Sequence, residues 1–198
     1  IKHTKNELKV QRDALNRFQR YLPTLQLKKQ LLQLVLRQLE VKLEAQRSAD
    51  TQEWAELATW VRLFGEPLDW GQWLAVRQIR VGQGNVAGVA IPTFEGVDFD
   101  RRLPDLFATP AWLDDGIEML ERRLRRRLEL QVLEEQMVRL AQELRTTNQR
   151  VNLFEKVKIP QAQENIRVIR IFLGDQMTAA VARSKIAKAK AVEQASAA

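Results

Sequence analysis

Residues that break helices are concentrated in the middle of this chain, and their placement restricts the fold more than any other feature. Seven of the 8 glycines lie between Gly65 and Gly116, and four of the 6 prolines lie between Pro67 and Pro110. The segments on both sides are long, charged and almost free of glycine and proline. Because both residue types disfavour helix interiors, the pattern predicts two long helical arms flanking an irregular centre.

The first arm has the heptad repeat of a coiled coil. It opens with Thr4 and Glu7 at the spacing of a capping box, in which Thr4 accepts from the Glu7 amide and Glu7 reaches back. With Leu8 as position a, nine of the thirteen a and d positions are apolar, which predicts a coiled-coil helix sustained over six heptads. These positions are Leu8, Gln11, Leu15, Phe18, Leu22, Leu25, Lys29, Leu32, Leu36, Leu39, Leu43, Gln46 and Asp50.

Two features modify the first arm. Additional apolar residues widen the stripe, so we expect this part of the helix to contact more than one partner surface; they are Leu27, Leu31, Leu34, Val35 and Val41. Pro23 removes one backbone hydrogen bond. Since the heptad repeat continues on both sides of Pro23, we expect a kink near Tyr21 and Leu22 and not the end of the helix.

The second arm starts near Pro110–Asp114 and carries a similar apolar row. Its members are Ile117, Leu120, Leu124, Leu128, Leu133, Met137, Leu140, Leu144, Thr147, Val151 and Phe154, then Ala162, Ile166, Ile169, Leu173 and Ala180. The spacing from Phe154 to Ala162 departs by about one residue from a strict heptad, a stutter that locally unwinds a supercoil. Pro160 lies at the same place, so we expect a bend there.

The centre predicts a hairpin with short helical turns. Val76–Val81 and Val86–Pro92 have strand character, and Gly82–Asn85 between them is typical of a hairpin connection. Short helical turns are expected around Pro67–Trp73 and Pro104–Phe107. All five tryptophans lie in or beside this segment and are interpreted as core or interface anchors, with at least one of Trp70 and Trp73 facing a partner. They are Trp54, Trp60, Trp70, Trp73 and Trp112.

These patterns predict a mainly all-α fold. Neither arm has an apolar face wide enough to be buried alone, so the simplest solution pairs them. Residues 1–64 and 113–198 are expected to form long helices that pair as an antiparallel two-helix coiled coil. Residues 65–112 are expected to form a small central knob with short helices and a short β-hairpin, within one single structural unit.

Composition argues against several kinds of active site. The chain has no cysteine and His3 is its only histidine, which excludes disulfides, thiolate metal sites and multi-histidine metal sites. Gly82, Gly84 and Gly88 approximate a dinucleotide-binding fingerprint, but the last gap is one residue too long and no helix pattern follows. We therefore expect no catalytic residue, no cofactor and no metal. No apolar run approaches the roughly 18 residues of a membrane span, so we expect no direct membrane insertion.

Positive charge is concentrated in the arms. The net charge is +7, and the densest run is Arg122–Arg127. Glu118 and Glu121 precede Arg122 and Arg125 by four residues, the favourable order for helical ion pairs, so we interpret the run as a solvated helix face or a protein contact. A nucleic-acid-binding rod is the alternative, because phosphates bind clustered cations.

Three segments resemble the D subunit of the V/A-type rotary ATPases. They are Thr4–Leu8 at the start of a long helix, Gly88–Pro92 in the centre and Arg150–Pro160 in the second arm. The stretch from Val151 and Asn152 to Pro160 is the most specific, and the order of helix, short knob and helix also matches. The resemblance extends over essentially the whole chain and indicates a bacterial branch of the family.

The resemblance implies a non-catalytic central stalk, or rotor shaft. Such a shaft transmits torque between the ring that hydrolyses or synthesises ATP and the ion-translocating membrane rotor. The implied partners are the catalytic and non-catalytic ring subunits (A and B), the small F subunit of the central stalk and a socket protein on the membrane rotor, with no nucleic acid. The implied location is cytoplasmic, as a peripheral membrane protein on the cytoplasmic face of the membrane.

Candidate partner-binding residues lie in the knob and in the tail. We expect contacts through Trp70, Trp73, Ile79, Val81, Val89 and Ile91 in the knob and through Lys185, Lys188 and Lys190 in the tail. The lysines could equally serve solubility near a helix C-terminus. A generic coiled-coil adaptor or scaffold is the alternative function, although an adaptor of that kind has no need of the hairpin.

Overall fold

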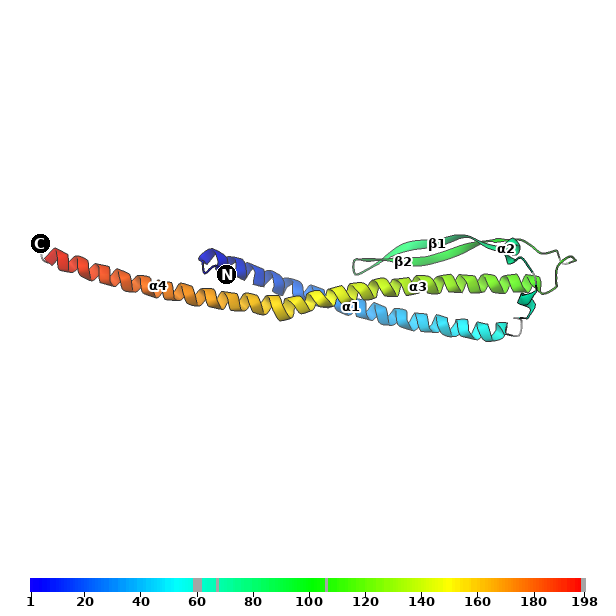
Figure 1. Cartoon of the computed structure of the whole chain (residues 1–198), viewed down its shortest axis with the longest axis horizontal. Coiled ribbons are helices and arrows are strands. Elements are labelled where there is room, and N and C mark those ends of the chain that lie inside the picture. The colour runs from blue at the N-terminus through cyan, green and yellow to red at the C-terminus, as the bar shows by residue number, and fades with distance from the viewer. Residues whose placement is uncertain (59–61, 67, 106, 197–198) are drawn as a thin grey trace. The chain divides into compact units, whose positions relative to one another are not determined.

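A computed structural model describes residues 1–58, 62–66, 68–105 and 107–196 of the chain (Figure 1). The elements in order are α1 (Lys5–Leu57), the 3-10 helix η1 (Leu63–Gly65), α2 (Trp70–Trp73), β1 (Leu74–Val86), β2 (Val89–Arg101), α3 (Leu113–Leu153), the π-helix η2 (Phe154–Lys158) and α4 (Ile159–Ser196). This mainly helical fold with one hairpin confirms the predicted fold class. Helix α1 ends at Leu57, before the expected limit at residue 64. Trp60, Pro67 and Leu106, which the predicted centre included, lie outside the described ranges.

The described residues form two compact units. Unit 1 contains residues 1–27 and the chain from residue 147 onward, and unit 2 contains residues 28–146. In unit 1, the ring centroids of Phe18 and Phe154 are 5.2 Å apart, and those of His3 and Phe172 are 4.8 Å apart. Because an earlier residue of one segment meets a later residue of the other, the helices of unit 1 are antiparallel.

Unit 2 has the same antiparallel pairing. Lys28 Nζ lies 2.6 Å from Glu143 Oε1, whereas Arg126 Nη2 lies 2.8 Å from Glu53 Oε1. The buried leucines of α1 lie at predicted a and d positions; they are Leu32, Leu36, Leu39 and Leu43. All thirteen predicted a and d positions of the first arm are buried or half-buried. The heptad assignment is therefore confirmed from Leu8 to Asp50.

The structure shows half of the predicted capping box at the start of α1 and a helix that continues through Pro23. The Glu7 amide donates to Thr4 Oγ1 at 3.2 Å, which is the first half of the capping box. The Glu7 carboxylate, however, accepts from Gln11 Nε2 at 2.8 Å. Helix α1 continues through Pro23, and the neighbouring Thr24 hydroxyl donates to the carbonyl of Tyr21 at 2.7 Å. The expectation that Pro23 would not end the helix is confirmed.

The irregular spacing in the second arm coincides with the π-helix. The backbone N–H of Ile159 bonds to the carbonyl of Phe154, five residues earlier, so this turn holds one residue more than an α-helical turn. Val151 is buried before this segment and Ala162 after it. The extra residue predicted between Phe154 and Ala162 is thus accommodated by η2, which keeps the apolar row on one face of the helix.

The hairpin turn differs from its predicted position. Strands β1 and β2 pair in an antiparallel two-stranded sheet, and the two residues between them are Ala87 and Gly88. Both have positive φ, 52° and 81°, as a two-residue hairpin loop with the right twist requires. The expected connection at Gly82–Asn85 is wrong, because those residues belong to β1. A Cβ on Gly82 would collide with the side chain of Glu95 on β2, so the glycine serves cross-strand packing there.

The hairpin is also longer than expected and packs onto helices within unit 2. Each strand has 13 residues, and the hairpin lies along α3 (Figure 1). Gln136 Nε2 donates to the carbonyl of Pro92 at 2.6 Å, and Arg139 Nη1 donates to that of Ala90 at 3.5 Å. Ile91 is buried with leucines of α1 and Leu140 of α3, and the tip residues Val86, Ala87 and Val89 pack against this cluster.

A second apolar cluster lies where the hairpin begins. Leu74, Leu113 and Ile117 are buried here. Trp70, Trp73 and Trp112 pack against them, and the ring centroids of Phe64 and Trp70 are 5.1 Å apart. The helical turn expected at Pro67–Trp73 is present as α2, but no helix forms in the described part of Pro104–Phe107. There the backbone N–H and side chain of Thr109 both donate to the carbonyl of Asp105, which makes a tight turn.

Candidate partner-binding surfaces

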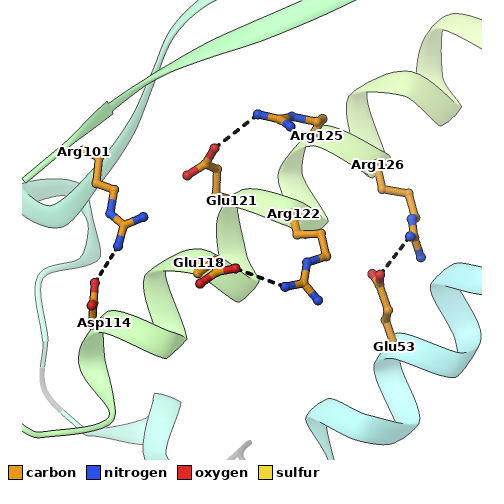
Figure 2. Close-up of polar contacts among 8 residues, drawn as sticks. All are labelled: Glu53, Arg101, Asp114, Glu118, Glu121, Arg122, Arg125 and Arg126. Carbon is orange, nitrogen blue, oxygen red and sulfur yellow. Dashed lines mark hydrogen bonds and ion pairs between the residues drawn. The ribbon is translucent and has the colours of Figure 1, made fainter.

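Carboxylates of α3 itself and of α1 pair with the arginine run of α3 (Figure 2). Arg122 Nη2 lies 3.4 Å from Glu118 Oε1, and Arg125 Nη2 lies 3.2 Å from Glu121 Oε1. Both ion pairs were predicted from the four-residue spacing and are confirmed. Arg126 points the other way and reaches Glu53 of α1. The run is therefore shared between an exposed face of α3 and the contact with α1.

Arg123 is the second arginine that faces α1. Its guanidinium lies 4.1 Å above the ring centroid of Trp54, and its Nη2 lies 3.5 Å from Asp50 Oδ1. Leu124, expected in the apolar row, is exposed instead. Its place in the predicted apolar row is therefore wrong, since the arginines on either side of it, Arg123 and Arg126, are the residues that face α1. Four arginines of the run have carboxylate partners, which compensates most of the positive charge that would attract phosphates.

The predicted contact residues of the knob are divided between its surface and its core. Ile79 and Val81 are exposed on β1, together with Val76. Val89 is half-buried and Ile91 buried in the cluster with the α1 leucines. Trp70 and Trp73 are likewise half-buried in the second cluster. The structure therefore places only Ile79 and Val81 of these six residues on an open surface.

The tail residues are all on the surface of α4. Lys185, Lys188 and Lys190 are exposed, and so are the apolar residues Met177, Val181 and Ile186 between and before them. A spacing of four residues places Met177 and Val181 on the same side of the helix, whereas Ile186, nine residues after Met177, lies on the opposite side. This part of α4 therefore offers both cations and apolar side chains to a partner.

Three of the additional apolar residues of α1 form an exposed stripe in unit 2, whereas Val35 is half-buried against the first cluster. Leu31, Leu34 and Val41 are all exposed, at helical spacings of three and seven residues that keep them on one face. The buried residues Leu32, Leu36 and Leu39 occupy the opposite side toward α3 and the hairpin. The stripe is where the sequence predicted a second partner surface for the arm.

Two exposed apolar residues are not among the candidate contact residues identified from the sequence. Leu103 is 78% exposed and Phe107 is 102% exposed, in the segment between β2 and α3. The sequence predicted a short helical turn at Pro104–Phe107, which does not decide whether Phe107 is exposed. The backbone N–H groups of Ala108 and Thr109 both donate to the carbonyl of Asp105, at the three- and four-residue spacings of a single helical turn.

No group of three or more histidine, aspartate or glutamate side chains suited to hold a metal ion occurs in the described ranges. Across those same residues, no helix is both long enough and apolar enough to cross a membrane. Exposed apolar and charged side chains lie on α1, β1, α4 and the segment before α3, and they form the candidate surfaces.

Known proteins match the chain over nearly its full length. The family model described as the D subunit of ATP synthase matches residues 7–189. A protein of Borreliella burgdorferi, named as the D subunit of V-type ATP synthase, is 44% identical over 194 residues, covering 98% of this chain and 96% of its own. Proteins of the same name from Chlamydia trachomatis and Chlamydia pneumoniae are 33% and 34% identical, each covering 96% of this chain and 95% and 92% of their own. The chain belongs to the family of D subunits of V-type ATP synthases.

Proposed function

We propose that the chain is the central rotor shaft of a V-type ATP synthase. It transmits torque between the ring that hydrolyses or synthesises ATP and the ion-translocating membrane rotor. The observation that carries this proposal is the continuous helix α1, which has heptad packing from Leu8 to Asp50 and pairs antiparallel with a second helix in both units. Two helices packed along such a seam resist twisting better than a single helix does.

The proposed role is mechanical and not catalytic. The described residues provide no group of side chains suited to hold a metal, and the sequence has no cysteine. The Glu164 carboxyl, whose pKa is lowered, lies on the surface in an ion pair with Arg167. ATP chemistry belongs, in this proposal, to the other subunits of the complex.

The exposed surfaces suggest how partners are divided between the units. We assign the tail of α4, with Lys185, Lys188 and Lys190, to contacts with the ring subunits (A and B). In this proposal the chain lies on the cytoplasmic face of the membrane. We assign the exposed residues Ile79 and Val81 of β1 to the small F subunit or the socket protein. Both assignments follow from exposure together with the apolar or cationic character of the side chains.

Truncation and surface substitution test this division. Removing residues 179–198 is expected to lower the rate of ATP hydrolysis by the assembled complex while binding to the membrane rotor persists. Replacing both Ile79 and Val81 by Ser is expected to weaken attachment to the rotor partners and to leave helix content unchanged. Deleting the hairpin is a poorer test, because Val86, Val89 and Ile91 pack against the core and their loss would unfold part of unit 2.

A generic adaptor is the competing function. An adaptor would hold partners together without moving relative to them, so fixing it covalently to the ring would leave hydrolysis intact. A shaft fixed in the same way would stop hydrolysis. The absence of native cysteines makes this comparison clean, because any cysteine introduced for cross-linking is the only one in the chain.

A further inference from the structure

Four charged side chains lie at the contact between α1 and α3, close to the end of α1. Arg123 Nη2 lies 3.5 Å from Asp50 Oδ1. Arg126 Nη2 lies 2.8 Å from Glu53 Oε1 (Figure 2). Each of the four side chains is between 19% and 24% exposed, so both ion pairs are largely shielded from water. We call Asp50, Glu53, Arg123 and Arg126 the charge cluster.

The two ion pairs of the charge cluster run diagonally between the helices. Because α1 and α3 are antiparallel, the later carboxylate on α1, Glu53, is nearest in height to the earlier arginine on α3, Arg123. Glu53 nevertheless pairs with Arg126, three residues further along α3. Glu53 Oε2 and Arg123 Nη1 are both buried, and neither has a hydrogen-bond partner among the described residues. Each of these two side chains therefore has one group left with which to pair with the other.

The leucine seam beside the charge cluster does not define a unique register by itself. Apolar residues on both helices repeat at spacings of four, three and four residues. They are Leu32, Leu36, Leu39 and Leu43 on α1 and Leu133, Met137, Leu140 and Leu144 on α3. A slide of α1 along α3 by one heptad therefore brings apolar residues against apolar residues again. Burial of the leucines alone does not select between these alignments.

The charge cluster does distinguish these alignments. On α3, the positions one heptad before and after Arg123 and Arg126 hold no charged residue; they are Gly116, Met119, Leu130 and Leu133. On α1, the positions one heptad before Asp50 and Glu53 are Leu43 and Gln46. A slide of one heptad in either direction would therefore leave both carboxylates facing uncharged residues. Largely buried charges without partners are costly, so these alignments are disfavoured.

We propose that the charge cluster determines the register of α1 on α3, by selecting one of the alignments that leucine packing allows. Polar residues at the seam of a coiled coil can specify its alignment in this way, at a cost in stability. Arg47 and Glu134 also join α1 to α3, but their side chains are 54% and 45% exposed, and an ion pair so well hydrated contributes little. The inference concerns the chain by itself and does not rest on the proposed function.

Distance measurements between two spin labels on the full-length chain test this proposal. The labels are attached to cysteines introduced at the exposed Gln33 of α1 and Gln131 of α3, in a chain without native cysteine. A slide of one heptad moves one helix by about 10 Å along the other, so it changes the distance between the labels. With the charge cluster intact, electron paramagnetic resonance is expected to give a single distance.

Replacing the whole charge cluster by apolar residues removes the proposed selection. The fourfold variant carries Asp50→Leu, Glu53→Met, Arg123→Met and Arg126→Met, which keep the side-chain volumes similar. It is expected to add a second label distance and to have an unchanged or higher melting temperature, because apolar residues of similar volume commonly replace a buried ion pair without loss of stability. A single distance equal to that of the intact cluster would overturn the proposal. So would loss of folding, because the proposal takes the cluster to be dispensable for packing.

Two control variants separate pairing from burial. Exchanging the charges between the helices, with Arg at positions 50 and 53 and Glu at positions 123 and 126, restores opposite partners and is expected to keep the single distance. Replacing Arg47 and Glu134 by Met removes an exposed pair between the same helices and is expected to keep it as well. A second distance in either control would contradict selection by this cluster.

A double-mutant cycle on Glu53 and Arg123 tests their pairing independently of the fourfold variant. Glu53→Gln and Arg123→Gln are each expected to lower the melting temperature. Together they are expected to lower it by less than the two separate shifts combined, because the second substitution removes a charge that the first has already left without its partner. Shifts that simply add would show that Glu53 and Arg123 act independently and would overturn the proposal that the four charges act as one set.

Discussion

The ion pairs of α3 differ in burial, and burial decides how much each of them stabilises the fold. The side chains of Arg126 and Glu53 are 22% and 19% exposed, whereas those of Arg122 and Glu118 are 59% and 64% exposed. Exposed pairs contribute little because water screens them. Removing one member of a largely buried pair is costly, because the other charge is left without its partner.

Arg126→Ala is therefore expected to lower the free energy of unfolding by about 1–3 kcal/mol. Arg122→Ala, in the same helix, is the matched control and is expected to change it by less than about 0.5 kcal/mol. Urea denaturation followed by circular dichroism measures both. Equal effects of the two substitutions would contradict the burial argument.

The pKa of Glu164 is a second test at the scale of single residues. The side-chain hydrogen bond from Arg167 lowers the pKa of this carboxyl below its ordinary value of 4.5. The pair therefore contributes stability above the ordinary pKa, and this contribution is lost as the pH falls through the lowered value. Arg167→Gln is expected to return the pKa toward 4.5, and Arg170→Gln, which removes a nearby exposed charge, is expected to leave it low. NMR titration of the glutamate side chains measures this, and a pKa unchanged by Arg167→Gln would contradict the assignment.

Among the elements, the π-helix is the one whose length can be tested directly. If η2 exists to absorb one extra residue, deleting the exposed Val157 converts it to an α-helix and keeps Ala162 and Ile166 on the buried face. The deletion is expected to leave the melting temperature unchanged or higher. Deleting the exposed Gln38 from α1 is the control, because α1 has no such turn.

The Gln38 deletion is expected to move Leu39 and Leu43 off the packed face and to cost several kcal/mol, as the loss of two buried leucines does. Thermal unfolding followed by circular dichroism compares the two variants. Similar destabilisation by both deletions would show that η2 is not a register adjustment.

The hairpin loop depends on a residue that tolerates positive φ. Gly88 has φ 81° and no atom within 4 Å of an added Cβ, so Gly88→Ala introduces backbone strain without a clash. The expected loss is about 1 kcal/mol of unfolding free energy. Gly65→Ala, where a Cβ also has open space, is expected to be close to neutral. Denaturant unfolding of both variants is the measurement, and equal stability of Gly88→Ala and wild type would contradict the loop geometry.

These elements also show what could be predicted from the sequence. The heptads of α1 and the one-residue irregularity after Phe154 were predictable, because helical packing depends on local spacing that the sequence displays. The hairpin turn was not, because Gly82 and Gly84 carry the same turn signal as Ala87 and Gly88. Only the cross-strand neighbours Thr93 and Glu95 distinguish a glycine in a strand from one in a turn.

At the scale of the whole molecule, surfaces were harder to predict than the core. Ile91 and Ile79 look alike in the sequence, yet one is buried against the helices and the other is exposed. Which hairpin face meets α3 is decided by contacts such as the hydrogen bond from Gln136 to Pro92, between residues 44 positions apart. The same is true of Arg123 and Arg126, whose partners lie on α1.

The central claim is that this chain turns relative to the ATP-hydrolysing ring. The most direct measurement fixes the ring of the assembled complex to a surface and attaches a bead to a single cysteine introduced at an exposed position of this chain, which has no native cysteine. The account predicts unidirectional rotation of the bead when ATP is added, and none without it. A bead that stays still while the same complexes hydrolyse ATP would contradict the claim.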